Sequence, residues 1–352
     1  MKESKNMTVG VLFGGKSTEH DVSCASAYSV LNNIDTDKFD VKIVGITKKG
    51  DFVPYEGPLE YIKDLTWDSE HESKGLTAGI QVLETCDVVF PVLHGLNGED
   101  GTIQGLLELL DKPYVGCNVL SSALAMDKAY AKIVFKAHGL PMCRHIVLTR
   151  KMILNNINEC ILNVSMKIKY PCFVKPANSG SSVGVYKCNT VDELKHALME
   201  AQKLDRRILV EECIYGKEIE CAVLGNEDDI YVALPGEIIP SKDFYDYEDK
   251  YIKGQSVSVI PAHLPESKRA QVMALAKQAY QSLDCSGLSR VDFFYVEETG
   301  QFYLNEINTL PGFTEISMYS KMWEASGMPY KNLLTELIEL AIKRKQETKR
   351  EF

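Results

Sequence analysis

Short continuous apolar runs alternate with amphipathic stretches along the first third of the chain. The runs "TVGVLFGG" (8–15), "FDVKIVGIT" (39–47) and "CDVVFPVLHG" (86–95) predict buried strands, whereas "DVSCASAYSVLNNI" (21–34) and "GTIQGLLELLD" (101–111) predict helices. Strands that are apolar throughout and alternate with helices are typical of a parallel sheet covered on both faces. We therefore predict an open α/β domain over residues 1–118.

A second domain is predicted over residues 119–210. A helical pattern covers 122–139, and short strand-like runs at 170–176, 181–188 and 206–213 surround a further helix at 190–204. Between the first two of these strands lies "KPANSGSSVG" (175–184), whose glycine and serine content predicts an exposed loop. This loop is a candidate lid.

The third domain is predicted over residues 211–352. Strand patterns at 217–225 and 229–238 precede a polar aromatic loop, "PSKDFYDYEDKYIKGQS" (240–256), and a helix at 266–284. An apolar hairpin follows, "RVDFFYVEETGQFYLNEINTLPG" (290–312), with its turn at 297–300. A final amphipathic helix is predicted at 330–347.

The hairpin contains polar residues where apolar ones are expected. Glu306 and Asn308 point to the same face of one strand, and the antiparallel return brings Asp292 close to Glu306. Two neighbouring carboxylates repel each other unless a cation lies between them, and Mg²⁺ prefers carboxylate and amide oxygens. We interpret the face as a metal site, and Phe294 on the same face favours a lined pocket. The alternative is a solvated face with ion pairs to lysines.

A nucleotide would complete such a site, and candidate phosphate ligands precede the hairpin. Lys175 ends a strand directly before the glycine- and serine-rich loop, and Lys128 begins a helix. Glu211 and Glu218 in "LVEECIYGKEIE" are placed to accept hydrogen bonds from an adenine amino group and ribose hydroxyls. The alternatives are a plain turn and surface acids. The loop is not a Walker A sequence, which excludes the P-loop class.

Two loops of the first domain are candidates for a small substrate. "FGGKSTEHDVS" (13–23) and "HGLNGEDGT" (94–102) follow predicted strands, and loops at the carboxyl ends of parallel strands form ligand crevices. Glu19 and His94 are therefore placed to meet a substrate, and Glu19 is suited to an ammonium group. Helix N-capping by nearby hydroxyls, with the acids favouring the helix dipole, is the alternative.

Composition narrows the choice of partners. The 352 residues are 45% hydrophobic and 25% charged, and the net charge of −10 argues against nucleic-acid and anionic-membrane surfaces. The ten cysteines contain no Cys-x-x-Cys pair, which favours free thiols. The N-terminal apolar run is too short for a signal sequence or a membrane span, so we expect a cytoplasmic protein that acts on small molecules.

Taken together, these stretches resemble the D-alanine:D-alanine ligases, which are ATP-grasp enzymes of peptidoglycan precursor synthesis. The resemblance covers nearly the whole chain and rests on motifs in the family's order: "GGKSTEHDVS", "HGLNGEDGTIQG", "ALAMDK", "KPANSGSSVGV", "EECIYGKEIE", "FYDYEDKY", "SRVDFF" and "NEINTLPGFTEISMYSKMW". It implies a three-domain ATP-grasp fold, α/β in class. An N-terminal open parallel sheet would be followed by central and C-terminal domains that clamp ATP.

The resemblance also implies a role for each matching residue. Two Mg²⁺ ions, with Mn²⁺ as an alternative, would be bound by Asp292, Glu306 and Asn308. ATP would contact Lys128, Lys175, Ser182, Glu211, Ile214, Glu218, Phe244 and Phe294. The substrates would contact Glu19, His94, Lys250, Ser317 and Met318, and catalysis would involve Glu19, Ser181, Tyr251, Arg290 and the backbone amide of Gly312. A homodimer and activation by K⁺ are further implications.

The identity of the second substrate is a separate question, because similar enzymes join D-alanine to D-serine or D-lactate. The Lys250–Tyr251 pair and the apolar Met318 after Ser317 favour D-alanine, since Met318 offers no partner to a serine hydroxyl. Glu315 and Ile316 depart from the commonest family pattern. The competing hypotheses are another ATP-grasp carboxylate-amine ligase and a non-catalytic nucleotide-binding module.

Overall fold

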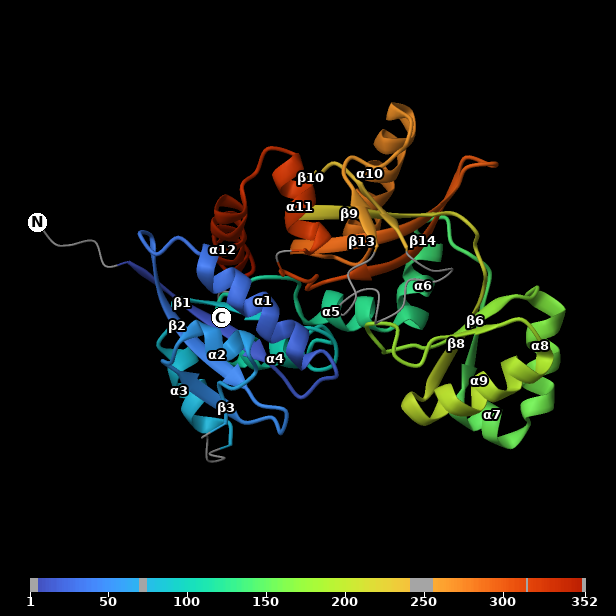
Figure 1. Ribbon diagram of the computed structural model, residues 1–352, viewed down its shortest axis with the longest axis horizontal. Coiled ribbons are helices and arrows are strands. Elements are labelled where there is room, and N and C mark those ends of the chain that lie inside the picture. Colours follow the sequence, from blue (N-terminus) through green and yellow to red (C-terminus); the bar gives the residue numbers. More distant parts are fainter. Residues whose placement is uncertain (1–5, 70–74, 241–255, 315, 350–352) are drawn as a thin grey trace, which may run out of the picture.

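The computed structural model describes residues 6–69, 75–240, 256–314 and 316–349. Three β-sheets organise this part of the chain, and they lie in three lobes (Figure 1). The first sheet has the strand order β3-β2-β1-β4, the second β5-β8-β6-β7, and the third β12-β11-β9-β13-β14 with β10 paired to β9. This arrangement confirms an α/β fold of several domains.

The N-terminal sheet is mostly parallel, as predicted. Strand β1 pairs in parallel with β2 and β4, and β3 adds an antiparallel edge. The elements of this lobe are β1 (Met7–Gly14), α1 (His20–Asn33), β2 (Phe39–Ile46), β3 (Phe52–Tyr55), α2 (Leu59–Lys63), α3 (Thr77–Glu84), β4 (Val88–Val92) and α4 (Thr102–Leu109).

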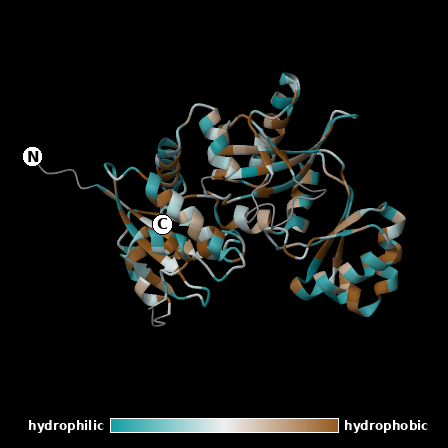
Figure 2. Cartoon of the chain, in the orientation of Figure 1, coloured by the Kyte–Doolittle hydropathy of each residue, from teal (hydrophilic) through white to brown (hydrophobic). Residues whose placement is uncertain are grey.

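Both faces of the N-terminal sheet are buried, which explains why its strands are apolar throughout. Val11 and Phe13 of β1 point into one core with α1 and the C-terminal helix α12 (Tyr330–Glu347), whereas Leu12 points into another with Leu107 of α4. Helix α12 thus returns to cover the first sheet, and Figure 1 shows it beside the N-terminal lobe. Figure 2 shows the apolar residues concentrated along the strands and the inner helix faces.

The second sheet forms a lobe with its own core. That core joins β6 and β8 to the apolar faces of α8 and α9. The elements of this part of the chain are α5 (Val119–Met126), α6 (Lys128–Ala137), β5 (His145–Thr149), α7 (Arg150–Asn155), α8 (Ile157–Lys167), β6 (Cys172–Pro176), β7 (Tyr186–Cys188), α9 (Val191–Leu204) and β8 (Arg207–Glu212).

The third sheet is built around β9, which pairs antiparallel with β13, and β13 pairs antiparallel with β14. The hairpin and the terminal helix α12 are confirmed. The remaining elements are β9 (Lys217–Asn226), β10 (Asp229–Val232), β11 (Gly236–Ile239), β12 (Val257–Val259), α10 (Glu266–Ser282), β13 (Gly287–Val296), β14 (Gln301–Asn308) and α11 (Met318–Ala325).

Three predicted elements differ from the structure. The strand predicted over 229–238 is two strands, β10 and β11, which pair with different parts of β9. The helix predicted over 122–139 is two helices, because Asp127 is extended and its side chain accepts hydrogen bonds from the backbone of Ala129 and Tyr130, so it begins a new helix. The strand predicted over 181–188 begins only at Tyr186. Ser181 and Ser182 adopt positive φ angles of 48° and 60°, which no strand tolerates.

The connection between the lobes bears on the predicted domain limits. Helices α5 and α6 follow the N-terminal sheet in sequence, yet Ala125 and Phe135 pack into the core of the third sheet with Tyr280. The limits at 118 and 210 remain predictions, and the core of the third sheet takes in part of the predicted central domain.

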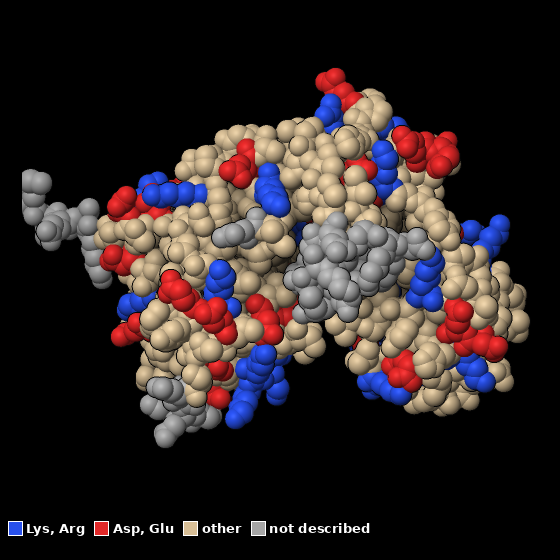
Figure 3. All heavy atoms as spheres, viewed as in Figure 1, with Lys and Arg blue, Asp and Glu red and all other residues tan. Residues whose placement is uncertain are grey.

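The ten cysteines all lie in the described part of the chain, and none of them forms a disulfide. All ten cysteines are free, and none of the described helices is long and apolar enough to cross a membrane. Basic and acidic side chains are interspersed over the face shown in Figure 3.

Arg344 of α12 links the first and third lobes through hydrogen bonds. Its guanidinium donates to the carbonyls of Gly116 and Tyr114 and to Ser286 Oγ at 2.7 Å, and it lies over the Tyr114 ring. We expect Arg344→Met to lower the free energy of unfolding by about 2–4 kcal/mol, because buried acceptors lose a charged donor. Urea unfolding measures this.

The matched control is Lys345→Met on the next residue of the same helix. Lys345 pairs with the exposed Asp111 at 2.7 Å, and such surface pairs contribute little to stability. Equal losses of unfolding free energy in the two variants would contradict the role of Arg344 in linking the lobes.

Candidate active site

The β13–β14 hairpin brings the predicted metal ligands together. Asp292 pairs with Glu306 across the ladder, and Arg290 pairs with Asn308. A β-bulge interrupts the register between Asp292 and Phe293. Asn305 of β14 has no register partner on β13, so β14 contains one extra residue at this point. The prediction that Asp292 lies close to Glu306 is confirmed.

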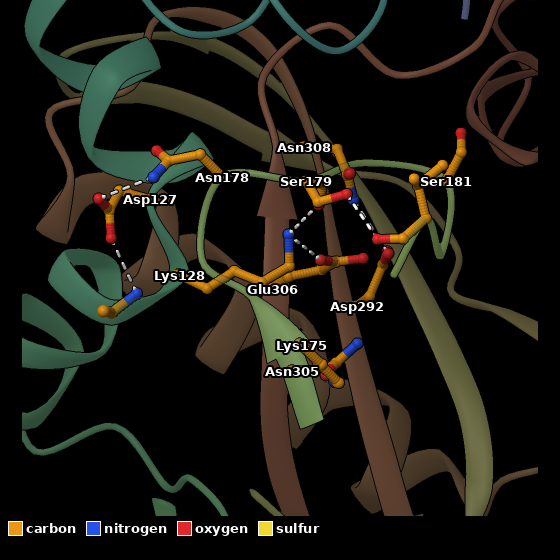
Figure 4. A network of polar contacts seen from close by, with 12 residues as sticks. Asp127, Lys128, Lys175, Asn178, Ser179, Ser181, Asp292, Asn305, Glu306 and Asn308 are labelled. Carbon is orange, nitrogen blue, oxygen red and sulfur yellow. Dashed lines mark hydrogen bonds and ion pairs between the residues drawn. The ribbon is translucent and has the colours of Figure 1, made fainter. Parts of the chain in front are cut away.

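Cations from the protein neutralise these carboxylates. Arg290 donates two parallel hydrogen bonds to Asp292, at 2.8 and 2.7 Å, and the Asn308 amide donates to Asp292 at 3.0 Å. Lys128 lies 3.2 Å from Glu306, and its Nζ also donates to the Ser179 carbonyl at 2.8 Å (Figure 4). The ion pairs anticipated as the alternative to a metal are therefore present, and they involve one lysine and one arginine.

A cavity of about 40 Å³ opens on the same face. Four carboxylates line it, from Glu218, Glu220, Asp292 and Glu306, and Arg290 is the cation among its lining residues. Glu220 lies opposite Asp292 on β9 and 3.3 Å from Arg290. This excess of negative charge around a small space favours a bound cation.

The donor set fits a divalent cation that is also bound to phosphate. Among the described residues, no group of three or more His, Cys, Asp or Glu side chains is close enough to hold a metal by itself. Asp292, Glu306 and the Asn308 amide supply only three donors. Mg²⁺ at nucleotide sites typically takes one or two carboxylates and completes its six ligands with phosphate and water.

The glycine- and serine-rich loop joins the central lobe to the N-terminal lobe. Positive φ angles at Ser181, Ser182 and Gly184 fold the backbone back on itself. Ser179 Oγ donates to the Val183 carbonyl at 2.7 Å, and Ser181 Oγ donates to Glu19. Successive residues with positive φ angles are typical of loops whose backbone amides bind phosphate.

Behind the loop, Glu211 is buried between two lysines. Its carboxylate lies 2.7 Å from Lys132 and 2.7 Å from Lys175, and the Lys132 side chain is only 1% exposed. Burial opposes ionisation, but the two lysine charges win and hold the pKa of Glu211 below its usual range. Lys175 is also 3.4 Å from Asn305 on the hairpin, so this network connects the central sheet to the β13–β14 hairpin.

Glu19 lies where two lobes meet. It is 5% exposed and is the N-cap residue of α1, but its side chain makes no capping hydrogen bond. A Cβ at Gly95 would overlap its carboxylate, and one at Gly180 would lie 2.6 Å away. Only glycine at both positions leaves room for this carboxylate beside Ser181, which favours a binding role over the capping alternative.

The other predicted site residues are distributed around this centre. Glu218 and Phe294 are register partners beside the cavity, and Ile214 follows β8. His94 lies at the end of β4, with both ring nitrogens hydrogen-bonded within the protein. Ser317 Oγ accepts from the Thr314 amide at 3.0 Å and lies where a Cβ on Gly312 would approach it to 2.9 Å.

Met318 has a different environment from the one expected for a subsite wall. It is 6% exposed and packs into the core against Gly236, Ile260 and Met322. Phe244, Lys250, Tyr251 and Glu315 lie outside the described residues.

Sequence reasoning missed several residues of this centre. Three residues that contact predicted site residues were not singled out: Lys132, Glu220 and Asn305. Glu99 was also missed; it binds the amide of Leu310, two residues before Gly312. Lys132 carried a usable signal, because it shares the buried helix face of Ala129 and Phe135. Asn305 carried none, since the bulge that exposes it depends on strand register.

Comparisons with known proteins agree with this geometry. The family model described as "D-ala D-ala ligase N-terminus" matches residues 8–117, and the one described as "D-ala D-ala ligase C-terminus" matches residues 134–339. The chain belongs to the D-alanine–D-alanine ligase family. ATP and a divalent metal ion are used by this family, which agrees with the acidic cavity and with the nearby Lys128 and Lys175.

Several members of this family are similar over nearly the whole chain. The D-alanine–D-alanine ligase of Ruminiclostridium cellulolyticum is 50% identical, covering 98% of this chain and 97% of its own. That of Clostridium novyi is 49% identical, covering 96% and 98%.

Solved structures from the D-alanine–D-alanine ligase family show the same fold. A D-Ala:D-Ser ligase from Enterococcus faecalis has a TM-score of 0.83 at 36% identity, covering 96% of this chain and 100% of its own. The D-alanine–D-alanine ligase from Coxiella burnetii has a TM-score of 0.81 at 37% identity, covering 98% and 96%.

The buried lysine–glutamate network gives a stability prediction. Lys132→Met removes one of the two lysines that pair with the buried Glu211 and leaves Lys175. Because a buried carboxylate then has less compensating charge, we expect a loss of roughly 2–3 kcal/mol in the free energy of unfolding at pH 7. Because the folded pKa of Glu211 is lowered, its stabilisation is present above about pH 4.5 and is lost as the pH falls. The variant should therefore lose less stability than the wild type on acidification.

Urea unfolding between pH 7 and pH 3 measures both effects. Lys136→Met is the control, because Lys136 is exposed one turn further along α6. Parallel acid profiles for the wild type and Lys132→Met would contradict the electrostatic account.

Proposed function

We propose that this enzyme joins two D-alanine molecules to D-alanyl-D-alanine, with conversion of ATP to ADP and phosphate, in peptidoglycan precursor synthesis. The observation that carries the proposal is the meeting of three parts at one place. Glu19 of the first lobe contacts Ser181 of the phosphate-covering loop, and Lys128 beside that loop contacts Glu306 of the hairpin. An ammonium site, a phosphate site and a cation site are thereby adjacent.

The nucleotide would lie between the second and third sheets. Lys128, Lys175 and Ser182 are placed toward its phosphates, and Glu211, Ile214, Phe294 and Phe244 toward its base, with Glu218 toward the ribose. Two Mg²⁺ ions would be held by Asp292, Glu306 and Asn308, where they would neutralise phosphate charge. The lysines add to that neutralisation at fixed positions, which is the main protein contribution to phosphoryl transfer.

The reaction would proceed in two steps. The carboxylate of the first D-alanine, whose ammonium group is held by Glu19, attacks the γ-phosphate of ATP and gives an acylphosphate and ADP. The neutral amine of the second D-alanine then attacks the acyl carbonyl, and the tetrahedral oxyanion expels phosphate. Arg290 and the Gly312 amide would stabilise that oxyanion, while Ser317 and Lys250 would bind the second carboxylate and Tyr251 would close the site.

The choice of D-alanine as second substrate rests on the relatives more than on Met318. The curated relatives described above are named for D-alanine on both sides, whereas the Enterococcus faecalis neighbour is named for D-serine. Met318 packs into the core, so any effect on the second subsite would act through its backbone or through Ser317. The use of ATP supports a cytoplasmic location, and a homodimer and K⁺ activation are further expectations.

Product analysis tests the function directly. Purified protein with ATP, Mg²⁺ and D-alanine alone should release one phosphate for each D-alanyl-D-alanine formed. D-alanyl-D-alanine should remain the main ligation product when D-serine or D-lactate is added. Absence of D-alanine-dependent phosphate release would refute the ligase activity, and a mixed product as the main species would refute the stated specificity.

Glu19 provides a sharper test of the substrate site. Glu19→Gln removes a carboxylate from an ammonium partner, so we expect kcat/KM for D-alanine to fall roughly 10- to 100-fold, which corresponds to a charged hydrogen bond of about 1.5–3 kcal/mol. The KM for ATP should stay near the wild-type value. Asp21→Asn is the control, because Asp21 lies on the same helix, is exposed and pairs with Lys48. If Glu19→Gln changed the KM for ATP more than kcat/KM for D-alanine, the proposal that Glu19 binds the D-alanine ammonium group would be wrong.

A further inference from the structure

The segment between β14 and α11 is held by side chains from the N-terminal lobe. Both backbone groups of Leu310 are bonded across more than 200 residues of sequence: its N–H donates to Glu99 Oε1 at 3.0 Å, and its carbonyl accepts from His94 Nδ1 at 2.9 Å. Two residues beyond Leu310 lies Gly312, whose amide is the proposed oxyanion donor.

The hydrogen bonds around His94 have a defined direction. A carbonyl can only accept, so Nδ1 carries the proton toward Leu310, and Nε2 is the acceptor for the Ser26 hydroxyl at 2.9 Å. Ser26 Oγ in turn accepts from the Phe313 amide at 3.2 Å. Burial lowers the pKa of His94 to about 4, which keeps the ring in this neutral form at physiological pH. The Leu310 carbonyl and the Phe313 amide, on either side of Gly312, are thus connected through His94 and Ser26.

Glu99 connects the same segment to the first substrate site. Its second oxygen, Oε2, accepts from the Gly95 amide at 2.9 Å, and Gly95 is the glycine that leaves room for the Glu19 carboxylate. Burial, together with the nearby charge of Glu19, raises the pKa of Glu99 to about 8. Placing a carboxylate here is energetically unfavourable, and its two backbone bonds offset part of that cost.

We propose that Glu99, with His94 and Ser26, is a set of positioning residues that fixes the Gly312 amide against the first substrate site and so serves the second step of the reaction. The inference rests on the proposed function. It differs from a direct substrate contact, because these side chains act through the backbone of Leu310 and Phe313.

The physical reason is the demand for preorganised donors. An oxyanion donor acts only if it already points to the place where charge will develop, and a displacement of about 1 Å can cost roughly 100-fold in rate. Phosphoryl transfer from ATP occurs at the hairpin face and does not use the Gly312 amide. Loosening the segment should therefore slow amine attack more than formation of the acylphosphate, and the waiting acylphosphate should be hydrolysed by water.

The test is the partition between two products. Glu99→Gln keeps the size of the side chain, but its amide nitrogen must face one of the two backbone N–H donors, so one bond is lost. We expect dipeptide formation to fall roughly 10- to 100-fold and D-alanine-dependent ADP formation to fall much less. The ratio of ADP to dipeptide, one in the wild type, should rise well above one.

Two further variants keep the test decisive. Ser26→Ala removes the acceptor of the Phe313 amide and the donor to His94, and it should also raise the ratio. Asp100→Asn is the matched control: Asp100 binds the amides of Asn97 and Thr102 in the loop that contains Glu99 but does not bond to residues 309–313. Its ratio should remain one even if the variant is less stable.

The outcomes separate this proposal from the function itself. A ratio of one in Glu99→Gln and Ser26→Ala, with ADP and dipeptide lowered together, would overturn the positioning role while leaving the ligase intact. If Glu99→Gln does not fold, the ratio in Ser26→Ala decides alone. Wild-type protein that forms no ADP in response to D-alanine would instead refute the proposed function.

Discussion

Repulsion among carboxylates on one sheet face is the constraint on which the rest of this structure depends. Strands β9, β13 and β14 bring four acids to a single small cavity, and such a cluster persists only where positive charge is supplied. Arg290 and Lys128 supply it in the protein alone. Lys128 begins helix α6, which precedes the central sheet. The charge balance of the third sheet therefore requires α6 to lie close to the hairpin.

The neighbouring loops follow from the same requirement. Lys128 binds both Glu306 and the Ser179 carbonyl, so one ammonium group sets the distance between the hairpin and the glycine- and serine-rich loop. The loop then extends to Glu19, and Glu19 has room only because Gly95 and Gly180 carry no side chain. The candidate site is thus assembled from contacts between lobes, which explains why each motif taken alone is a weak signal of function.

Local sequence patterns were sufficient where a feature depends on the alternation of strand residues or on continuous apolar strands. The two-residue period placed Asp292 opposite Glu306, and the parallel N-terminal sheet was evident from its apolar strands. The patterns failed where structure depends on distant partners. Asp127, where the predicted helix breaks, forms an ion pair with Arg207, and the burial of Lys132 required Glu211, nearly 80 residues later. The packing of Met318 into the core depended on Gly236 in the same way.

The return of α12 to the first sheet affects how the protein is made. Val11 and Phe13 share a core with α1 and with Leu334 and Ile338 of α12, so the first sheet leaves the ribosome with this apolar face only partly covered, by α1, until the last helix has been synthesised. Contacts of such long sequence separation form slowly, and an exposed apolar sheet face in the meantime is a site for aggregation. Nascent chains that stop before Tyr330 should therefore depend on chaperones, although every strand of their first sheet is already present.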